Sequence, residues 1–199
     1  MSTIKASRGR PKSINRDDVL DIAIDNYWRK GIDSVSINEL CKTANVSKPA
    51  LYREFGNEDE LMTSVLARYE KKVLAPILDI AQNDSPFTDT MNNMVIYVTS
   101  DETEVQKPVG CLLANMFEHR RKLGSLTIAQ IELTHNNVLS VMENWIEKSK
   151  ANGELSTEMS STFAATYINS QMSHAQCQLI RGEDRHKVRA ILQTAMSVF

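Results

Sequence analysis

Apolar residues recur at helical spacing along almost the whole chain, starting in its N-terminal third. Val19, Ile22, Ala23 and Tyr27 follow the i, i+3, i+4, i+8 spacing of one helix face. Gly31 comes next and can end this helix, because glycine adopts the positive φ of a C-cap without steric cost. The pattern therefore predicts a first helix of about fifteen residues.

Two short helices are predicted directly after the first one. Ser36 and Glu39 fit a capping box, in which a hydroxyl and a carboxylate satisfy free N–H groups at a helix start. Asn45 tolerates the positive φ of a tight turn, and Ser47 offers the next N-cap with Pro49 in the first helical turn. Two short helices joined by a tight turn behind a longer helix describe a helix-turn-helix, although an ordinary helical hairpin has the same spacing.

Long amphipathic segments fill the rest of the chain. Further helices are predicted near residues 57–74, 76–83, 86–99, 109–122, 125–151, 157–181 and 184–198, with Pro76, Pro86 and Pro108 at breaks or in first turns. We therefore predict an all-α fold of about nine to ten helices. Its expected parts are a basic flexible arm over 1–14, a three-helix helix-turn-helix domain over 15–60, and a larger helical domain over 61–199.

Composition indicates a globular protein. Seven Gly and five Pro in 199 residues are few, which argues against collagenous, linker-like or mostly disordered chains. No apolar run approaches the roughly 18 residues of a membrane-spanning helix, and the N-terminal residues lack the apolar stretch of a signal peptide. We therefore expect a cytoplasmic protein that does not enter a membrane. Three cysteines, Cys41, Cys111 and Cys177, are too few for a disulfide framework, so we interpret them as thiols.

The net charge of -2 conceals a basic N-terminus. Residues 1–16 include Lys and Arg side chains and no acid. Because a basic cluster attracts phosphates, this arm is predicted to face an anionic partner, unless it is simply a solvated tail. Within it, the segment Arg8-Gly9-Arg10-Pro11 resembles the core of an AT-hook, whose arginines enter a narrow A·T minor groove.

The stretch VSINELCKTANVSKPALYREFGNEDEL carries a specific resemblance. Together with its flanks, over residues 16–62, it is similar to the DNA-binding domain of TetR-family transcriptional regulators. Three positions depart from that family's pattern. Asn45 replaces the usual turn glycine, Glu54 stands where a His is frequent, and Glu58 stands where a Lys often meets a phosphate. Glu54 is a possible acceptor for a cytosine amino group, so we interpret these changes as altered DNA specificity.

The resemblance and the helix pattern together give the predicted contacts to double-stranded DNA. Leu51 and Phe55 must face the small core, which turns Lys48, Pro49, Ala50 and Arg53 of the third helix toward the major groove, with Arg53 as the base reader. The resemblance implies that Ser36, Ser47 and Tyr52 hold the DNA backbone. Arg8 and Arg10 of the arm are added as minor-groove contacts.

The resemblance also implies that residues 61–199 bind a small-molecule effector and form a homodimer. Adaptable apolar residues predicted to line an effector cavity are Met91, Met94, Tyr97, Met116, Phe117, Met142, Trp145 and Phe163, with plain core packing as the alternative for each. In the family the last two long helices pair with those of a second subunit. Tyr167 and Met172 lie in a suitable apolar stripe, which could equally be an ordinary core face.

Catalysis and metal binding find little support in the sequence. There is no Gly-rich phosphate loop, no G-x-S-x-G and no paired metal-ligand spacing, so we predict neither an enzyme nor a cofactor. His174 and Cys177 offer at most half a metal site, and no metal is predicted.

The predicted function is a ligand-responsive transcriptional regulator, in the form of a repressor that binds a palindromic operator as a dimer and is released by an effector. Two alternatives stay open. One is a redox or electrophile sensor acting through Cys111, which follows Pro108 and Gly110 near a helix N-terminus where a thiolate is favoured. The other is a DNA-binding protein that responds to no ligand.

Overall fold

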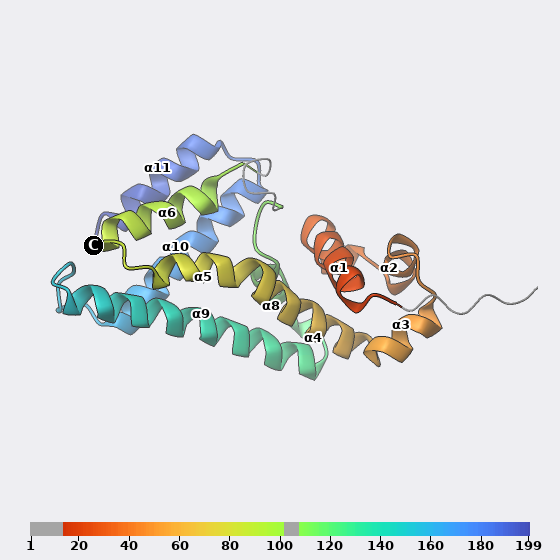
Figure 1. Cartoon of the computed structure of the whole chain (residues 1–199). Coiled ribbons are helices and arrows are strands. Elements are labelled where there is room, and N and C mark those ends of the chain that lie inside the picture. Colours follow the sequence, from red (N-terminus) through yellow and green to blue (C-terminus); the bar gives the residue numbers. More distant parts are fainter. Residues whose placement is uncertain (1–13, 102–107) are drawn as a thin grey trace, which may run out of the picture.

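The computed structural model describes residues 14–101 and 108–199, and all regular structure in these residues is helical (Figure 1). The α-helices are α1 (Arg16–Lys30), α2 (Ile37–Thr43), α3 (Lys48–Phe55), α4 (Glu58–Tyr69), α5 (Ala75–Gln82), α6 (Phe87–Thr99), α8 (Leu112–Glu118), α9 (Ser125–Ala151), α10 (Ser161–Ile180) and α11 (Arg185–Met196). Short 3-10 turns occupy Ile32–Ser34 and Arg120–Lys122, and a π-helical turn occupies Glu70–Leu74. The all-α prediction is confirmed.

The helices form a small unit and a larger body (Figure 1). Helices α1, α2 and α3 lie at one end, and α4 leads from them into the body. There α9 runs along one side and packs against α4 and α10, while α11 packs against α6 and α10. None of the helices in the described residues is both long and apolar enough to cross a membrane.

Local capping signals set the ends of the first helices as predicted. The Ser36 hydroxyl accepts a hydrogen bond from the Glu39 N–H at 3.2 Å, and Asn45 turns the chain with a φ of 53°. One half of the predicted capping box is wrong. The Glu39 carboxylate does not bind the backbone N–H of Ser36. It accepts a hydrogen bond from Lys30 Nζ at 2.7 Å, because the end of α1 lies beside it.

The helix predicted at 109–122 is much shorter than expected, since α8 spans only Leu112–Glu118. Gly110 has a φ of 94°, which excludes it from a helix, and a Cβ at this position would lie 2.5 Å from Cδ1 of Ile180. The predicted start at residue 157 is also wrong. Helix α10 begins after Ser160, whose hydroxyl accepts the N–H of Phe163 at 3.1 Å.

Pro76 lies in the first turn of α5, as its position in the sequence predicted. The chain does not leave helical geometry before it, because the π-helical turn Glu70–Leu74 joins α4 to α5. A proline cannot donate a backbone hydrogen bond to the preceding turn, and a π turn is one way to absorb that loss. A continuous helical rod therefore runs from the three-helix unit into the body.

Candidate functional site

Helix α3 buries one side and presents the other. Leu51 and Phe55 are buried in the core of the three-helix unit, whereas Lys48, Pro49 and Arg53 are exposed. No hydrogen bond or ion pair within the described residues holds Arg53, so its guanidinium is free to bind another molecule. Arginine can form paired hydrogen bonds to guanine, which suits the predicted role.

The remaining predicted contacts of this unit surround the exposed side of α3. Ala50 and Tyr52 are half-buried, and Lys48 Nζ lies 5.6 Å from the centre of the Tyr52 ring. Ser36 and Ser47 are exposed and cap α2 and α3, accepting backbone N–H groups at 3.2 and 3.3 Å. A capping hydroxyl keeps its own O–H to donate, so both serines remain able to bind a phosphate oxygen.

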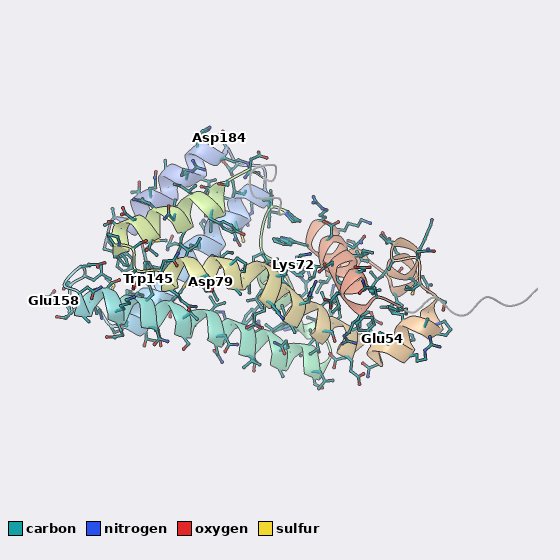
Figure 2. The ribbon with its side chains drawn as sticks, viewed as in Figure 1. Glu54, Lys72, Asp79, Trp145, Glu158 and Asp184 are labelled. Atoms are coloured by element: carbon teal, nitrogen blue, oxygen red, sulfur yellow. The ribbon has the colours of Figure 1, made fainter. Side chains whose placement is uncertain are left out.

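Arg16 at the start of α1 clamps the C-terminal end of α3 (Figure 2 labels Glu54). Its guanidinium donates to the Glu54 carbonyl at 3.1 Å and to the Glu54 carboxylate at 3.4 Å, and it donates to Ser64 Oγ at 3.0 Å. The same guanidinium lies 4.4 Å from the centre of the Phe55 ring. Glu54 therefore carries a compensated charge, which the sequence pattern alone did not predict.

The remaining predicted features of the DNA interface are Glu58 and the arginines of the N-terminal arm. Glu58 is exposed at the start of α4 and has no partner among the described residues. Its carboxylate would repel a phosphate at this position. Arg8 and Arg10 lie outside the described residues, so their predicted minor-groove contacts stay predictions.

An ion-pair network fixes α1 on α4. Arg68 donates to Asp17 at 2.9 Å and to Asp21 at 3.0 Å, and Lys72 donates to Asp21 at 2.8 Å. The hydrogen bond from Arg68 holds the pKa of Asp21 below its ordinary value, with Lys72 adding to the effect. The three-helix unit is thereby held to the rod that enters the body.

A second contact joins the three-helix unit to the segment between α8 and α9. Lys122 Nζ donates to the Asp33 carboxylate at 2.6 Å, and His119 Nε2 lies 3.5 Å from the same carboxylate. The hydrogen bond from Lys122 lowers the pKa of Asp33. Polar contacts therefore join the segment that follows α8 to the three-helix unit.

The body contains a cavity of about 390 Å³, bounded by α5, α6, α8, α9 and α10. Two of the predicted effector residues, Phe117 and Met142, line it. The other six lie elsewhere: Met91, Met94 and Met116 are buried in the core, Trp145 stacks on Phe87 at 4.7 Å, Tyr97 is half-buried, and Phe163 is 59% exposed on α10. Figure 2 labels Trp145 in the body, far from Glu54.

Sequence reasoning missed the polar wall of this cavity. Asn169, Ser173 and Gln176 of α10 line it, spaced so that they share one face of that helix. The signal was present as neutral polar residues at i, i+4 and i+7. The residues predicted to line the cavity were methionines and aromatic residues, so these polar positions were not predicted.

Cys111 lies at the junction of the cavity and α4. It lines the cavity, and the Tyr69 hydroxyl donates to its Sγ at 3.5 Å while accepting the N–H of Leu112 at 3.3 Å. Burial raises the pKa of Tyr69 well above its ordinary value, so this hydroxyl keeps its proton. Cys177 lines the same cavity.

The suggested half of a metal site is occupied by other bonds. His174 Nε2 lies 2.9 Å from Gln178 Nε2 on the same helix. Within residues 14–101 and 108–199, no group of three or more His, Cys, Asp or Glu side chains is arranged to hold a metal ion.

The two residues predicted for the dimer face differ in position. Tyr167 is half-buried, donates to the Ala195 carbonyl at 3.0 Å and lies beside Phe163. Met172 is only 6% exposed and lines the cavity. Three large apolar side chains in this part of the chain are exposed: Phe163 of α10, which stacks on the Tyr167 ring, Ile191 of α11, and Val198, which follows α11.

Comparison with known proteins agrees with this architecture. The model of the tetR family of bacterial regulatory proteins matches residues 19–65. The HTH-type transcriptional repressor ComR of Escherichia coli (strain K12) is 24% identical over 98% of this chain and 94% of ComR. The repressor BdcR of the same organism is 33% identical over 43% of this chain and 45% of BdcR.

Solved structures share the fold over nearly the whole chain. A cysteine mutant of the TetR family regulator CifR, complexed with 26-bp double-strand operator DNA, has a TM-score of 0.80 at 18% identity and covers 96% of this chain and 100% of its own. The reduced form of NemR from Escherichia coli has a TM-score of 0.80 at 15% identity, over 90% of this chain and 94% of NemR. Residues 19–65 therefore form a DNA-binding domain of the tetR family of bacterial regulatory proteins, and the match to a named repressor over nearly the whole chain supports a DNA-binding transcriptional regulator of that family.

Proposed function

We propose that this regulator is a repressor that binds a two-fold symmetric operator as a homodimer and is released by a small-molecule effector. The observation that carries the proposal is the exposed face of α3, with an unpartnered Arg53, joined by one helical rod to a body that contains a cavity. ComR and BdcR are named repressors, and the CifR mutant is complexed with operator DNA, which supports the same role here.

The DNA contacts divide into reading and positioning groups. Arg53 is proposed to read a base in the major groove, and Lys48, which is also exposed, binds a base or a phosphate. The hydroxyls of Ser36 and Ser47 and the N–H groups at the starts of α2 and α3 bind phosphates. The phosphate contacts set the register of the protein on the DNA and do not distinguish bases. The preference for one base over another therefore depends on Arg53.

Homodimer formation is proposed through α10 and α11. We define the C-terminal face as Phe163 and Tyr167 of α10, Ile191 of α11, and Val198, which follows α11. Large apolar side chains that remain exposed and close together favour a protein partner. A second copy of this chain would double the reading helices and suit a two-fold symmetric operator.

The effector response is proposed to run from the cavity through α8 and α4 to α1. Phe117 and Cys111 line the cavity at the two ends of α8, and Tyr69 of α4 accepts the first N–H of that helix. The Tyr69 ring meets Trp28 of α1 edge-on, with centroids 5.0 Å apart. An occupant that displaces α8 would therefore shift α4 against the DNA-binding unit and change the spacing of the two reading helices.

The test is selection of bound fragments from the native genome with the purified full-length protein. Enriched fragments are expected to share a two-fold symmetric sequence, and Arg53→Ala should lose its preference for one base in each half. Enrichment of fragments with no common sequence would contradict the repressor proposal. If the protein binds an operator from which no compound related to the neighbouring genes releases it, that result would favour the ligand-independent alternative.

A second candidate function is electrophile or oxidant sensing through Cys111. It is favoured by the contact of this thiol with both the cavity and the Tyr69 hydroxyl, since modification of Sγ would disturb the support of α8. Mild peroxide or an electrophile should then release the wild-type protein from DNA and leave Cys111→Ser bound. Equal release of both proteins, or of neither, would contradict this role.

A further inference from the structure

The cavity has one wall that is apolar and neutral. Leu74 of the π-helical turn, Leu78 of α5, Leu113 of α8, and Val138 and Met142 of α9 contribute to it. None of the described residues that line the cavity is a lysine or an arginine. An anion placed against this wall would lose its hydration without gaining a counter-charge, which is strongly unfavourable.

Two ionisable residues, Glu118 and His135, also line the cavity. Glu118 is exposed, and His135 is half-buried beside the Phe117 ring with centroids 5.9 Å apart. The Arg120 guanidinium covers that ring from outside, 4.6 Å from its centre. Glu118 is exposed, so water screens its charge, and the positive Arg120 lies exposed two residues farther along the chain.

The opposite wall carries hydrogen-bonding groups that are not used within the protein. Asn169, Ser173 and Gln176 of α10 are half-buried and line the cavity, and no hydrogen bond within the described residues engages their side chains. Each of the three can donate a hydrogen bond, through an amide N–H or a hydroxyl. They form a row of donors facing an apolar wall, which is a complementary surface for a carbonyl oxygen on an otherwise apolar molecule.

We infer that the effector is an uncharged, mainly apolar compound with a carbonyl group that accepts hydrogen bonds from this row on α10. The inference rests on the proposed function, because it names the class of molecule that the effector cavity takes. The volume of about 390 Å³ is near the lower end of the range for ligand pockets, which favours a compact molecule over an elongated one. Cys111 and Cys177 lie in the same lining and add no donor of comparable strength.

The experiment compares four compounds with one skeleton on the full-length protein. Benzophenone is neutral with a carbonyl, diphenylmethane lacks the carbonyl, para-benzoylbenzoate adds an anionic group, and para-(aminomethyl)benzophenone adds a cationic one. Affinities are measured by calorimetry and by displacement of the neutral fluorophore N-phenylnaphthylamine. Benzophenone is expected to bind about 10- to 100-fold tighter than diphenylmethane, which is the net effect of two hydrogen bonds of about 3- to 10-fold each, one from Ser173 and one from Gln176. Both charged compounds should bind at least about 10-fold more weakly than benzophenone.

Matched variants locate the hydrogen bonds. Ser173→Ala and Gln176→Leu should each weaken benzophenone about 3- to 10-fold and leave diphenylmethane unchanged. Ser170→Ala, on the exposed side of the same helix, should change neither affinity. Ala114→Trp, which fills the cavity from α8, should abolish binding of both compounds, with thermal melting as the check that each variant is folded.

Several results would overturn the inference: no binding of benzophenone, para-benzoylbenzoate binding as tightly as benzophenone, or folded Ser173→Ala and Gln176→Leu variants that bind benzophenone like the wild type. Release of a selected operator fragment is measured separately by fluorescence anisotropy. If the compounds bind in the expected order and DNA stays bound, the ligand class is supported and the proposed release mechanism is contradicted. If DNA is never bound, the proposed function fails while the binding order still decides the ligand class.

Discussion

The Thr127 hydroxyl donates a hydrogen bond to the Asp59 carboxylate at 2.6 Å, and the Thr127 backbone N–H donates to it at 2.9 Å. The Leu126 N–H adds a third bond at 3.0 Å. A carboxylate on α4 thus caps the N-terminus of α9, where a negative charge is favoured by the helix dipole. Gly124 leaves room for it, since a Cβ there would lie 2.1 Å from the Asp59 carboxyl carbon.

Asp59→Ala should lower the free energy of unfolding by about 1–2 kcal/mol, because it leaves the first N–H groups of α9 without this acceptor. Urea denaturation of the full-length protein measures the change. Asp18→Ala removes an exposed acid from the first turn of α1 and serves as the control, with an expected change within about 0.5 kcal/mol. Equal stability of Asp59→Ala and wild type would mean that water replaces the cap.

The same contact should make stability depend on pH in acid. Burial raises the pKa of Asp59, but the hydrogen bonds from Thr127 and Leu126 outweigh burial and hold the pKa below its ordinary value. A lowered pKa in the folded state contributes stability above the unfolded value of about 3.9, and the contribution is lost as pH falls below it. The difference in stability between wild type and Asp59→Asn should therefore be constant above about pH 5 and shrink as the pH falls from about 5 to about 2, through the lowered pKa of Asp59. A difference that is constant over this range would contradict the prediction.

Arg53→Ala should weaken binding to the selected operator by about 1–3 kcal/mol per half-site and relax the preference at one base position. The reason is that Arg53 is exposed on α3 and has no partner in the described residues. Arg29→Ala removes another exposed arginine of the same unit, paired with Asp25 at 2.6 Å, and should leave operator affinity unchanged. Fluorescence anisotropy on operator variants tests both, and unchanged specificity in Arg53→Ala would exclude base reading by this residue.

Removal of residues 1–14 should weaken binding to many sequences rather than to one. It deletes Lys5, Arg8, Arg10 and Lys12. Log affinity falls with log salt concentration, and each phosphate contact that is lost makes this negative slope shallower by about 0.9. Affinity is measured for the operator and for a scrambled duplex at several salt concentrations. A truncated protein with the wild-type salt slope would identify the arm as a solvated tail.

Phe163→Asp and Ile191→Asp should dissociate the dimer, because each places a charge in the centre of the C-terminal face. Light scattering measures the mass in solution. Leu133→Asp, at a similarly exposed leucine of α9 outside this face, is the control and should remain dimeric. Dimers in all three variants would place the interface elsewhere.

Local signals were sufficient for the DNA-binding unit. Ser36 and Ser47 were recognised as N-caps and Asn45 as a turn residue, and all three have these roles in the structure. Such signals act within four residues along the chain, so they can be read without knowing what packs where. The same is true of the exposed side of α3, which follows from the helical period once Leu51 is assigned to the core.

The cavity could not be predicted in the same way. Met94 and Met142 are both buried apolar residues on amphipathic helices, yet only Met142 borders the space between α9 and α10. Periodicity tells which side of a helix avoids water, but it does not tell which other helix fills that side. Phe163 illustrates the limit, since it was predicted to line the effector cavity and is instead exposed on α10.

The sequence by itself determined most of the helices, several of their caps and the exposed face of α3, because short-range hydrogen bonding and the helical period fix these features. Only the tertiary structure decided the contacts between distant segments. The bond from Thr127 to Asp59 spans 68 residues, and the pairing of Arg16 with Glu54 spans 38. The polar row on α10 lines a cavity only because apolar residues of other helices form the remaining walls. Packing sets these contacts, and packing depends on the shapes of all the helices at once.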